Sequence, residues 1–238
     1  VLPVFGKMSR GRITAIHIRK YMDMRGTKST TRANREHSFM SKVFSWGIQR
    51  KPDIKENPCR KVNKFPEKPR TRYITDAEYQ AVLIQAPPLL QAAMEISYCC
   101  AARQGDVLKL RRQDQLEEGL YIRQSKTGKE QIKRWTPRLR NAVNLALSQQ
   151  RAVSSAVWIL ADNGGTLSAD KLRKLYSRAK QQAQELNPDL RFDFTFHDIK
   201  AKSISDYDKG DKRNFSGHKS DAQVADYDRR PTVVDALD

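Results

Sequence analysis

The feature that most constrains the fold is the segment at residues 64–70, whose sequence is Lys-Phe-Pro-Glu-Lys-Pro-Arg. Proline disrupts helices and central strands, and it holds the preceding residue in an extended conformation, so this charged segment is typical of a linker. We therefore predict a linker at residues 66–72 between two domains, residues 1–65 and residues 73–238. The chain has 238 residues, enough for each domain to bury a hydrophobic core of its own.

Positive charge is concentrated in the first third of the chain. The whole sequence has 45 Lys and Arg against 27 Asp and Glu, a net charge of +18, and residues 1–70 hold 18 of the basic residues but only 5 of the acidic ones. Chains with this charge usually bind nucleic acid or an anionic membrane. No apolar run approaches the ~18–20 residues that span a bilayer, and the N-terminal residues do not resemble a signal peptide. We therefore expect a cytoplasmic protein that binds nucleic acid.

Two helices are predicted in residues 1–65. Apolar residues recur with helical spacing over residues 13–24, and a second helix is predicted from about residue 30 to Trp46. We expect Phe39, Val43 and Phe44 on an apolar face of this second helix. The opposite face is predicted to bind DNA phosphates through Arg32, Arg35 and Lys42. For any one of these cations, simple solvation is the alternative.

The second domain alternates helical segments with one hairpin. Thr75 followed by Glu78 is a capping box that opens a helix, and residues 89–100 are apolar enough to form a core helix. Two β-prone runs, residues 120–125 and 130–135, flank the turn sequence Lys-Thr-Gly-Lys and predict an antiparallel hairpin. The expected fold class is therefore α+β, mainly α with a small antiparallel β-sheet.

Six residues suited to act on a phosphate follow one another along this domain: Arg103, Lys126, His197, Lys200, His218 and Tyr227. Asp106 follows Arg103 by three residues, His197 and Lys200 have the spacing His-x-x-Lys, and Tyr227 follows His218 by nine residues. The set resembles the active-site positions of the tyrosine recombinases, the phage integrase family. Any one motif is weak, but six in order form a strong signal. Residues 1–65 resemble the helical core-binding domain of that family. We expect that a separate N-terminal arm-binding domain is missing from this sequence.

The resemblance implies a role for each residue. A phenol has a pKa near ~10 and is a poor nucleophile at neutral pH, so a tyrosine that attacks needs cations and a proton acceptor beside it. The implied nucleophile is Tyr227, preferred over Tyr207, and Arg229 with Arg230 would favour its phenolate. Arg103 is implied to clamp the phosphate, and Asp106 to orient the guanidinium or its surroundings. Lys126 is the implied general acid, with Lys129 ranked second, and Lys200 and His218 would stabilise charge. His197 would manage the proton of the nucleophile, and we place it in the first turn of a helix capped by Thr195.

The sequence departs from the family pattern at two places. The family usually has arginine where this chain has Lys200, and lysine keeps the charge but loses the planar, two-point recognition of phosphate. The segment between Lys200 and His218 is also shorter than is common in the family.

The activity implied by the resemblance is site-specific DNA recombination by a phage or prophage integrase, through a 3′-phosphotyrosyl intermediate. We expect no cofactor and no metal, because cations take the metal's place and the cysteines lack zinc spacing. The expected partners are double-stranded DNA at attachment or core sites, three further copies of the chain on synapsed DNA, and accessory DNA-bending proteins or an excisionase. The expected location is the nucleoid of a bacterial host. The alternatives are a resolvase or transposon recombinase of the same family, and a DNA-binding remnant with impaired catalysis.

Overall fold

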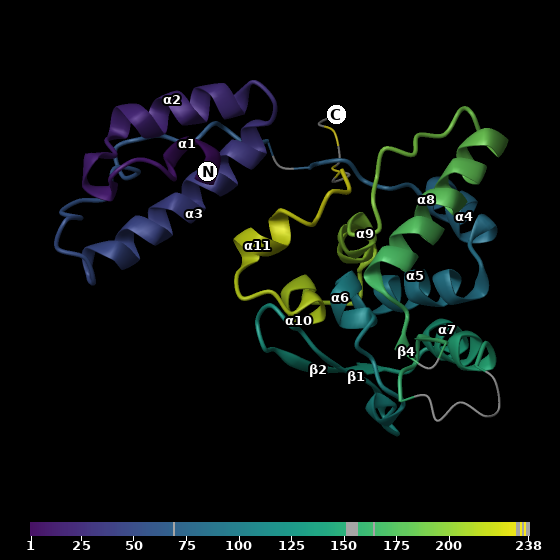
Figure 1. Cartoon of the computed structure of the whole chain (residues 1–238). Helices are drawn as coiled ribbons and strands as arrows, with labels where there is room; N and C mark the ends of the chain where they lie inside the picture. The colour runs from purple at the N-terminus through teal and green to yellow at the C-terminus, as the bar shows by residue number, and fades with distance from the viewer. Residues whose placement is uncertain (69, 151–156, 164, 232–233, 235, 237–238) are drawn as a thin grey trace. The chain divides into compact units, whose positions relative to one another are not determined.

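The computed structural model describes residues 1–68, 70–150, 157–163, 165–231, 234 and 236 (Figure 1). The chain divides into two compact units, Val1–Pro69 and Arg70–Asp238, and the division falls inside residues 66–72. None of the described helices is long and apolar enough to cross a membrane. The mainly helical fold class with small antiparallel sheets is confirmed.

The first unit is a helical pair with short additional turns. It contains α1 (Leu2–Phe5), a 3₁₀ turn η1 (Arg10–Arg12), α2 (Ala15–Gly26) and α3 (Thr30–Ile48). The last two helices lie against each other, and Ser29 caps the second of them by accepting a hydrogen bond from the backbone N–H of Arg32. Both long helices were predicted, with boundaries close to those observed.

The buried face of α3 differs from the prediction. Phe44 is buried as predicted, but Phe39 and Val43 are exposed, and the buried stripe also includes Asn34 and His37. Hydrogen bonds offset part of the cost of burying these polar side chains: His37 Nε2 contacts Cys59 O at 3.1 Å, and Asn34 Nδ2 donates to Phe65 O at 2.8 Å. His37 Nδ1 has no partner among the described residues. An apolar pattern cannot reveal a buried stripe of this kind.

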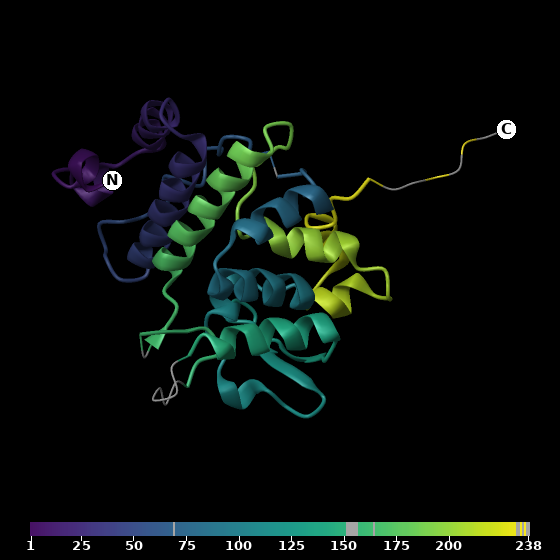
Figure 2. The ribbon, with the colours of Figure 1, turned by 90° about the vertical axis from the view of Figure 1, so that its right-hand side faces the viewer.

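The second unit is built around α5 (Pro88–Cys100). Figure 2 shows this helix between α7 (Pro137–Ser148) and α9 (Asp198–Asp206), and it also contacts α4 (Asp76–Gln85) and α8 (Ala169–Leu186). Side chains of α5 including Leu90, Met94 and Ile96 are fully buried at the centre of the core. The predicted capping box is confirmed, since Thr75 Oγ1 accepts from the N–H of Glu78 and the Glu78 carboxylate accepts from the N–H of Thr75.

Two small sheets complete the second unit. The predicted hairpin is confirmed: β1 (Gly119–Arg123) pairs antiparallel with β2 (Glu130–Arg134), with Leu120 opposite Lys133. A shorter pair joins β3 (Ala161–Asp162) to β4 (Gly165–Thr166). The remaining elements are short: α6 (Gln104–Val107), the 3₁₀ turn η2 (Arg112–Asp114), α10 (Lys212–Ser216) and α11 (Asp221–Ala225).

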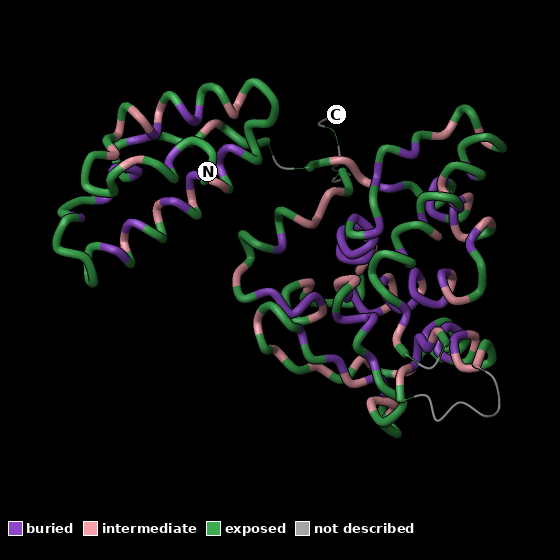
Figure 3. The backbone as a smooth tube through the Cα atoms, viewed as in Figure 1, coloured by how far each residue is buried: buried purple, intermediate pink, exposed green. Residues whose placement is uncertain are grey.

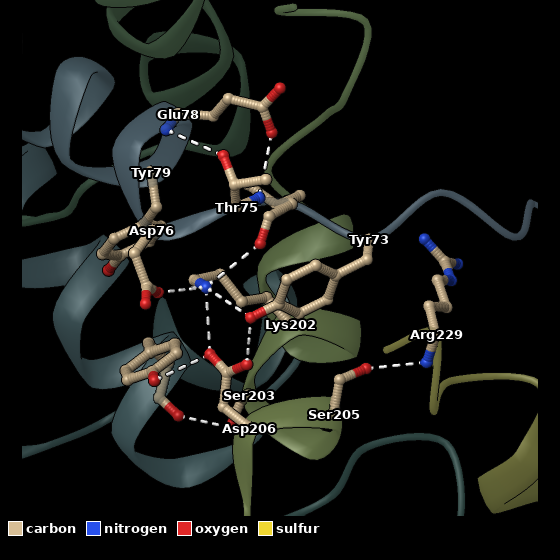
Figure 4. A network of polar contacts seen from close by, with 12 residues as sticks. Tyr73, Thr75, Asp76, Glu78, Tyr79, Lys202, Ser203, Ser205, Asp206 and Arg229 are labelled. Carbon is tan, nitrogen blue, oxygen red and sulfur yellow. Dashed lines mark hydrogen bonds and ion pairs between the residues drawn. The ribbon is translucent and has the colours of Figure 1, made fainter. Parts of the chain in front are cut away.

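Helix α9 is buried along nearly its whole length (Figure 3), although its sequence contains two lysines and two aspartates. Lys202 is held by the network in Figure 4: its Nζ donates to Asp76 Oδ1 at 2.6 Å and to Ile74 O at 3.1 Å, and it lies 3.0 Å from Asp206 Oδ2. Burial alone would lower the pKa of Lys202, but its hydrogen bonds to Asp76, Asp206 and Tyr73 raise it above the ordinary value. The ammonium therefore stays charged and fixes α9 against the segment that precedes α4.

Candidate active site

The six predicted catalytic residues lie on segments at the ends of short elements in the second unit. Arg103 is the N-cap of α6, Lys126 lies in the β1–β2 turn, and His197 and Lys200 lie at the start of α9. His218 follows α10, and Tyr227 follows α11. Helix α9 begins at Asp198 with His197 as its N-cap, so the helix starts two residues later than the prediction of a cap at Thr195, and His197 precedes the first turn. The cause is Asp198 Oδ2, which accepts from both the N–H and the hydroxyl of Thr195.

Arg103 is held by Gln124, which the sequence analysis did not identify. Arg103 Nη1 donates to Gln124 Oε1 at 3.0 Å. Asp106, expected to orient Arg103 or its surroundings, instead accepts from the backbone N–H of Ser125 at 2.9 Å, and its buried Oδ2 has no partner among the described residues. Asp106 therefore anchors the hairpin turn, while Gln124 contacts the guanidinium directly. Other N–H groups of the half-buried arginine remain for a ligand.

Lys126 is exposed at the tip of the hairpin turn, and the lower-ranked candidate Lys129 is half-buried beside it. The positive charge of Lys126 is close enough to contribute to lowering the pKa of His218. An exposed lysine on a turn can change rotamer without disturbing a core, as a residue that meets a ligand must.

Lys200 points into the protein. Its side chain is only 1% exposed, and Nζ donates to Ala101 O at 2.6 Å and to Ser216 O at 3.3 Å. Ala101 is the C-cap of α5 and has a left-handed backbone with φ 49°. Burial, followed by the charges of Arg103 and Lys133, lowers the pKa of Lys200 to about 7. An ammonium has three donors, and two of them are used here.

His218 is buried, and its Nε2 has no partner among the described residues. Ser216 Oγ lies 2.9 Å from Nδ1, closer than its 3.4 Å contact with Arg213 O, which favours donation of the hydroxyl proton to Nδ1 and a ring proton on Nε2. Burial, then the charges of Lys200, Arg103 and Lys126, lowers the pKa of His218 to about 4. The imidazole is therefore neutral at pH 7 and can offer Nε2–H to an anion.

Tyr227 lies beside both His197 and His218. Its hydroxyl lies 3.4 Å from His197 Nε2, and its ring centroid lies 4.8 Å from that of His218. The Lys200 Nζ lies 5.9 Å from the centre of the Tyr227 ring. Burial is the main cause that lowers the pKa of His197, so this imidazole is neutral at pH 7 and able to accept a proton. The other tyrosine considered, Tyr207, stacks on Phe215 with centroids 3.9 Å apart.

The segment after Tyr227 is fixed by a buried ion pair. Arg229 Nη1 lies 2.8 Å from Asp198 Oδ1, and the two side chains are only 10% and 4% exposed. Ser205 Oγ accepts from the N–H of Arg229 at 2.7 Å and donates to Tyr227 O at 3.2 Å. The expectation that Arg229 directly favours a phenolate is therefore not supported, because its charge is matched by Asp198. Its observed contacts hold the tyrosine segment against α9.

The three predicted DNA-binding residues belong to the first unit. Arg32, Arg35 and Lys42 are all exposed on α3, and Arg32 Nε lies 2.7 Å from Glu36 Oε1. Glu36 also binds Arg25 and Tyr21, so part of the positive charge of α3 is matched within its own unit.

Comparison with known proteins finds integrases among the proteins similar to this chain. No protein-family model matches the chain. An integrase of Escherichia phage HK022 is 30% identical over 189 residues, which cover 73% of this chain and 51% of the relative, so the chain spans about half of that protein's length.

Two solved structures share the fold. A lambda integrase dimer bound to a core site matches with a TM-score of 0.78 and 22% identity, over 96% of this chain and 84% of the other. A lambda integrase tetramer bound to a Holliday junction matches with a TM-score of 0.73 and 21% identity, over 90% of this chain and 66% of the other.

Proposed function

We propose that the chain is a tyrosine recombinase of the family that includes the phage integrases, and that it cuts and rejoins DNA at specific sites through a 3′-phosphotyrosyl intermediate. The observation that carries the proposal is the approach of the Tyr227 hydroxyl to His197 Nε2 at 3.4 Å, with Arg103, Lys200 and His218 supplied by neighbouring segments. A nucleophile, a proton acceptor and cations are the groups that attack on a phosphodiester requires.

In the proposed cleavage step, Tyr227 Oη attacks the phosphorus atom and its proton passes to His197 Nε2. The bond between phosphorus and the 5′ oxygen breaks, and Lys126 Nζ gives a proton to that oxygen. Arg103, the His218 Nε2–H and the charge of Lys200 stabilise the negative charge that develops on the other phosphate oxygens. In the rejoining step, a 5′ hydroxyl from another strand gives its proton to Lys126 Nζ and attacks the phosphorus atom, the bond between phosphorus and Tyr227 Oη breaks, and His197 returns the proton to the phenol.

Asp106 has a different proposed role from the one expected. Through the N–H of Ser125 it holds the turn that precedes Lys126, so its effect on chemistry passes through the general acid rather than the guanidinium. Lys200 is proposed to act as a charge beside the phosphate while its carbonyl contacts keep the loops of Ala101 and Ser216 in place.

The proposed partners follow from charge and from the structural relatives. We propose that residues 1–65 bind duplex DNA through Arg32, Arg35 and Lys42, and that the catalytic domain comprises residues 73–238. Assembly of four copies on synapsed attachment or core sites is supported by the tetrameric lambda integrase on a Holliday junction. Accessory DNA-bending proteins or an excisionase, and a location at the bacterial nucleoid, remain part of the proposal. The remnant alternative is not favoured, because the nucleophile and its proton acceptor remain in contact.

The experiment that tests the proposal uses a nicked duplex from the DNA that flanks the gene. We expect an SDS-resistant protein–DNA adduct that is lost in Tyr227→Phe and retained in Tyr207→Phe. The second variant is a matched control, because phenylalanine preserves the stack on Phe215. Tight binding of the duplex without any adduct would contradict the proposal and favour a DNA-binding remnant.

A further inference from the structure

Gln124 occupies the centre of the candidate site, yet the proposed reaction gives it no role. It follows β1, and its side chain is only 5% exposed. Its Oε1 accepts from Arg103 Nη1 at 3.0 Å and from Thr127 Oγ1 at 3.1 Å, and its Nε2 donates to Ser216 O at 2.9 Å. One buried amide therefore joins the Arg103 loop, the Lys126 turn and the turn that leads to His218.

Its partners allow only one orientation of this amide. A guanidinium can only donate hydrogen bonds, and a backbone carbonyl can only accept them. Gln124 must therefore present its oxygen to Arg103 and its nitrogen to Ser216. A buried amide satisfied on both sides holds its neighbours firmly, because breaking either contact leaves a desolvated polar group without a partner.

Gln124 is one of three hairpin side chains that bind the end of α10. The last carbonyls of a helix have no partners within the helix. Here Gln131 Nε2 donates to Asn214 O at 2.6 Å, Lys133 Nζ donates to Phe215 O, and Gln124 Nε2 donates to Ser216 O. Three consecutive carbonyls are thus satisfied by the hairpin, which fixes the Lys126 turn relative to the His218 turn.

The fit of the amide against the backbone explains the glycine that precedes His218. Gly217 has φ +69°, and a Cβ placed on it would lie 2.2 Å from Gln124 Nε2 and 2.7 Å from Gln131 Oε1. Any other residue would therefore push these two amides away from the carbonyls that they bind.

We propose that Gln124 is a positioning residue for strand cleavage. Its amide aims the Arg103 guanidinium at the phosphate and locks the turn that carries Lys126 to the turn that carries His218. The inference rests on the proposed function, since it assigns the residue a part in that reaction. Gln124 itself does not touch the DNA.

The test measures adduct formation and DNA affinity for the full chain and for Gln124→Met, which removes both hydrogen-bonding groups and keeps the length of the side chain. Loss of a residue that orients a metal ligand typically costs about 10–100-fold, and we expect a loss of similar size in the rate of adduct formation at saturating DNA, with the DNA dissociation constant unchanged. Gln115→Met is the matched control, because Gln115 is half-buried outside the site and donates only to Arg112 O. It should react at the wild-type rate.

A double-mutant cycle distinguishes positioning from general loss of structure. Because Gln124 acts in part through Arg103, Gln124→Met should slow an Arg103→Lys variant by a smaller factor than it slows the wild-type chain, since one of the groups that it positions is already gone. Equal fold losses in both backgrounds, weaker DNA binding, or a wild-type rate in Gln124→Met would overturn the inference while leaving the proposed function standing. Absence of a Tyr227-dependent adduct in the wild-type chain would overturn both.

Discussion

The ion pair between Asp198 and Arg229 offers a sharp test of how Tyr227 is held. Both side chains are buried, at 4% and 10% exposure, so solvent screens their attraction little. Asp198→Asn keeps the shape of the side chain but leaves the Arg229 charge without a counterion. Breaking a buried pair in this way costs about 3–5 kcal/mol, because an uncompensated charge remains in the interior. The partly exposed Arg70, which also contacts Asp198, can return to water and should add little.

The magnitude can be measured with a double-mutant cycle that adds Arg229→Met. Removing both partners leaves no unpaired charge, so the double variant should be at least about 2 kcal/mol more stable than the sum of the single losses predicts. Urea unfolding in a Trp46→Phe background is a suitable assay, because the remaining tryptophans, Trp135 and Trp158, both lie in the second unit. Strictly additive losses would refute the reasoning.

The same pair predicts a pH dependence of stability. Burial tends to raise the pKa of Asp198, but hydrogen bonds from Arg229 and Thr195 and the charge of Arg229 lower it below the ordinary value. The folded state therefore favours the carboxylate, and the stability gained is fully present above the unfolded pKa of about 4 and is lost as pH falls through the lower folded value. Asp198→Asn should lose less stability on acidification than the wild-type chain. Parallel acid unfolding curves would contradict this.

Three further outcomes are expected. The pKa of Lys200 is lowered to about 7, so its charge in the free protein is lost as pH rises through that value. The rate of adduct formation of Lys200→Arg, divided by the wild-type rate, should therefore rise between about pH 7 and pH 9. A constant ratio would refute a role for the charge of Lys200. Gly217→Ala should slow adduct formation at least ~10-fold through displacement of Gln124, and an unchanged rate would show that the amide can move. Lys202→Met should lower the free energy of unfolding of the second unit by about 3–5 kcal/mol, measured in urea. Lys209 is exposed, so Lys209→Met should change that free energy by no more than ~0.5 kcal/mol. Equal effects of the two variants would contradict the importance of the buried network around Lys202.

The sequence predicted the parts of the fold that depend on local signals. The capping box at Thr75 and the hairpin around Lys126 are both observed, because each is determined by contacts within a few residues. The polar members of the buried face of α3 were missed because Asn34 and His37 are buried through hydrogen bonds to residues more than 20 positions away. Hydrogen bonds between residues so far apart in the sequence cannot be predicted from the pattern of apolar residues.

The candidate site shows the same division. The six predicted catalytic residues could be identified because their order resembles that of the tyrosine recombinase active site. Gln124 and the Asp198–Arg229 pair have no such motif. Glutamine is common and uncharged, and its importance arises only when Arg103 and Ser216 are brought to its two ends, 21 and 92 residues away. Asp198 adjoins His197 in the sequence, and this position could have marked it as a residue near the site. Its partner Arg229 lies 31 residues further on, and we had predicted that Arg229 stabilises the phenolate of Tyr227.

The central claim, that Tyr227 becomes joined to the 3′ end of cleaved DNA, is tested most directly by isolating the adduct and mapping it. After digestion with protease and nuclease, mass spectrometry should find the nucleotide on the peptide that contains Tyr227, and the released strand should carry a free 5′ hydroxyl that a polynucleotide kinase can label at once. A nucleotide on another residue, or a 5′ phosphate on the released strand, would contradict the account.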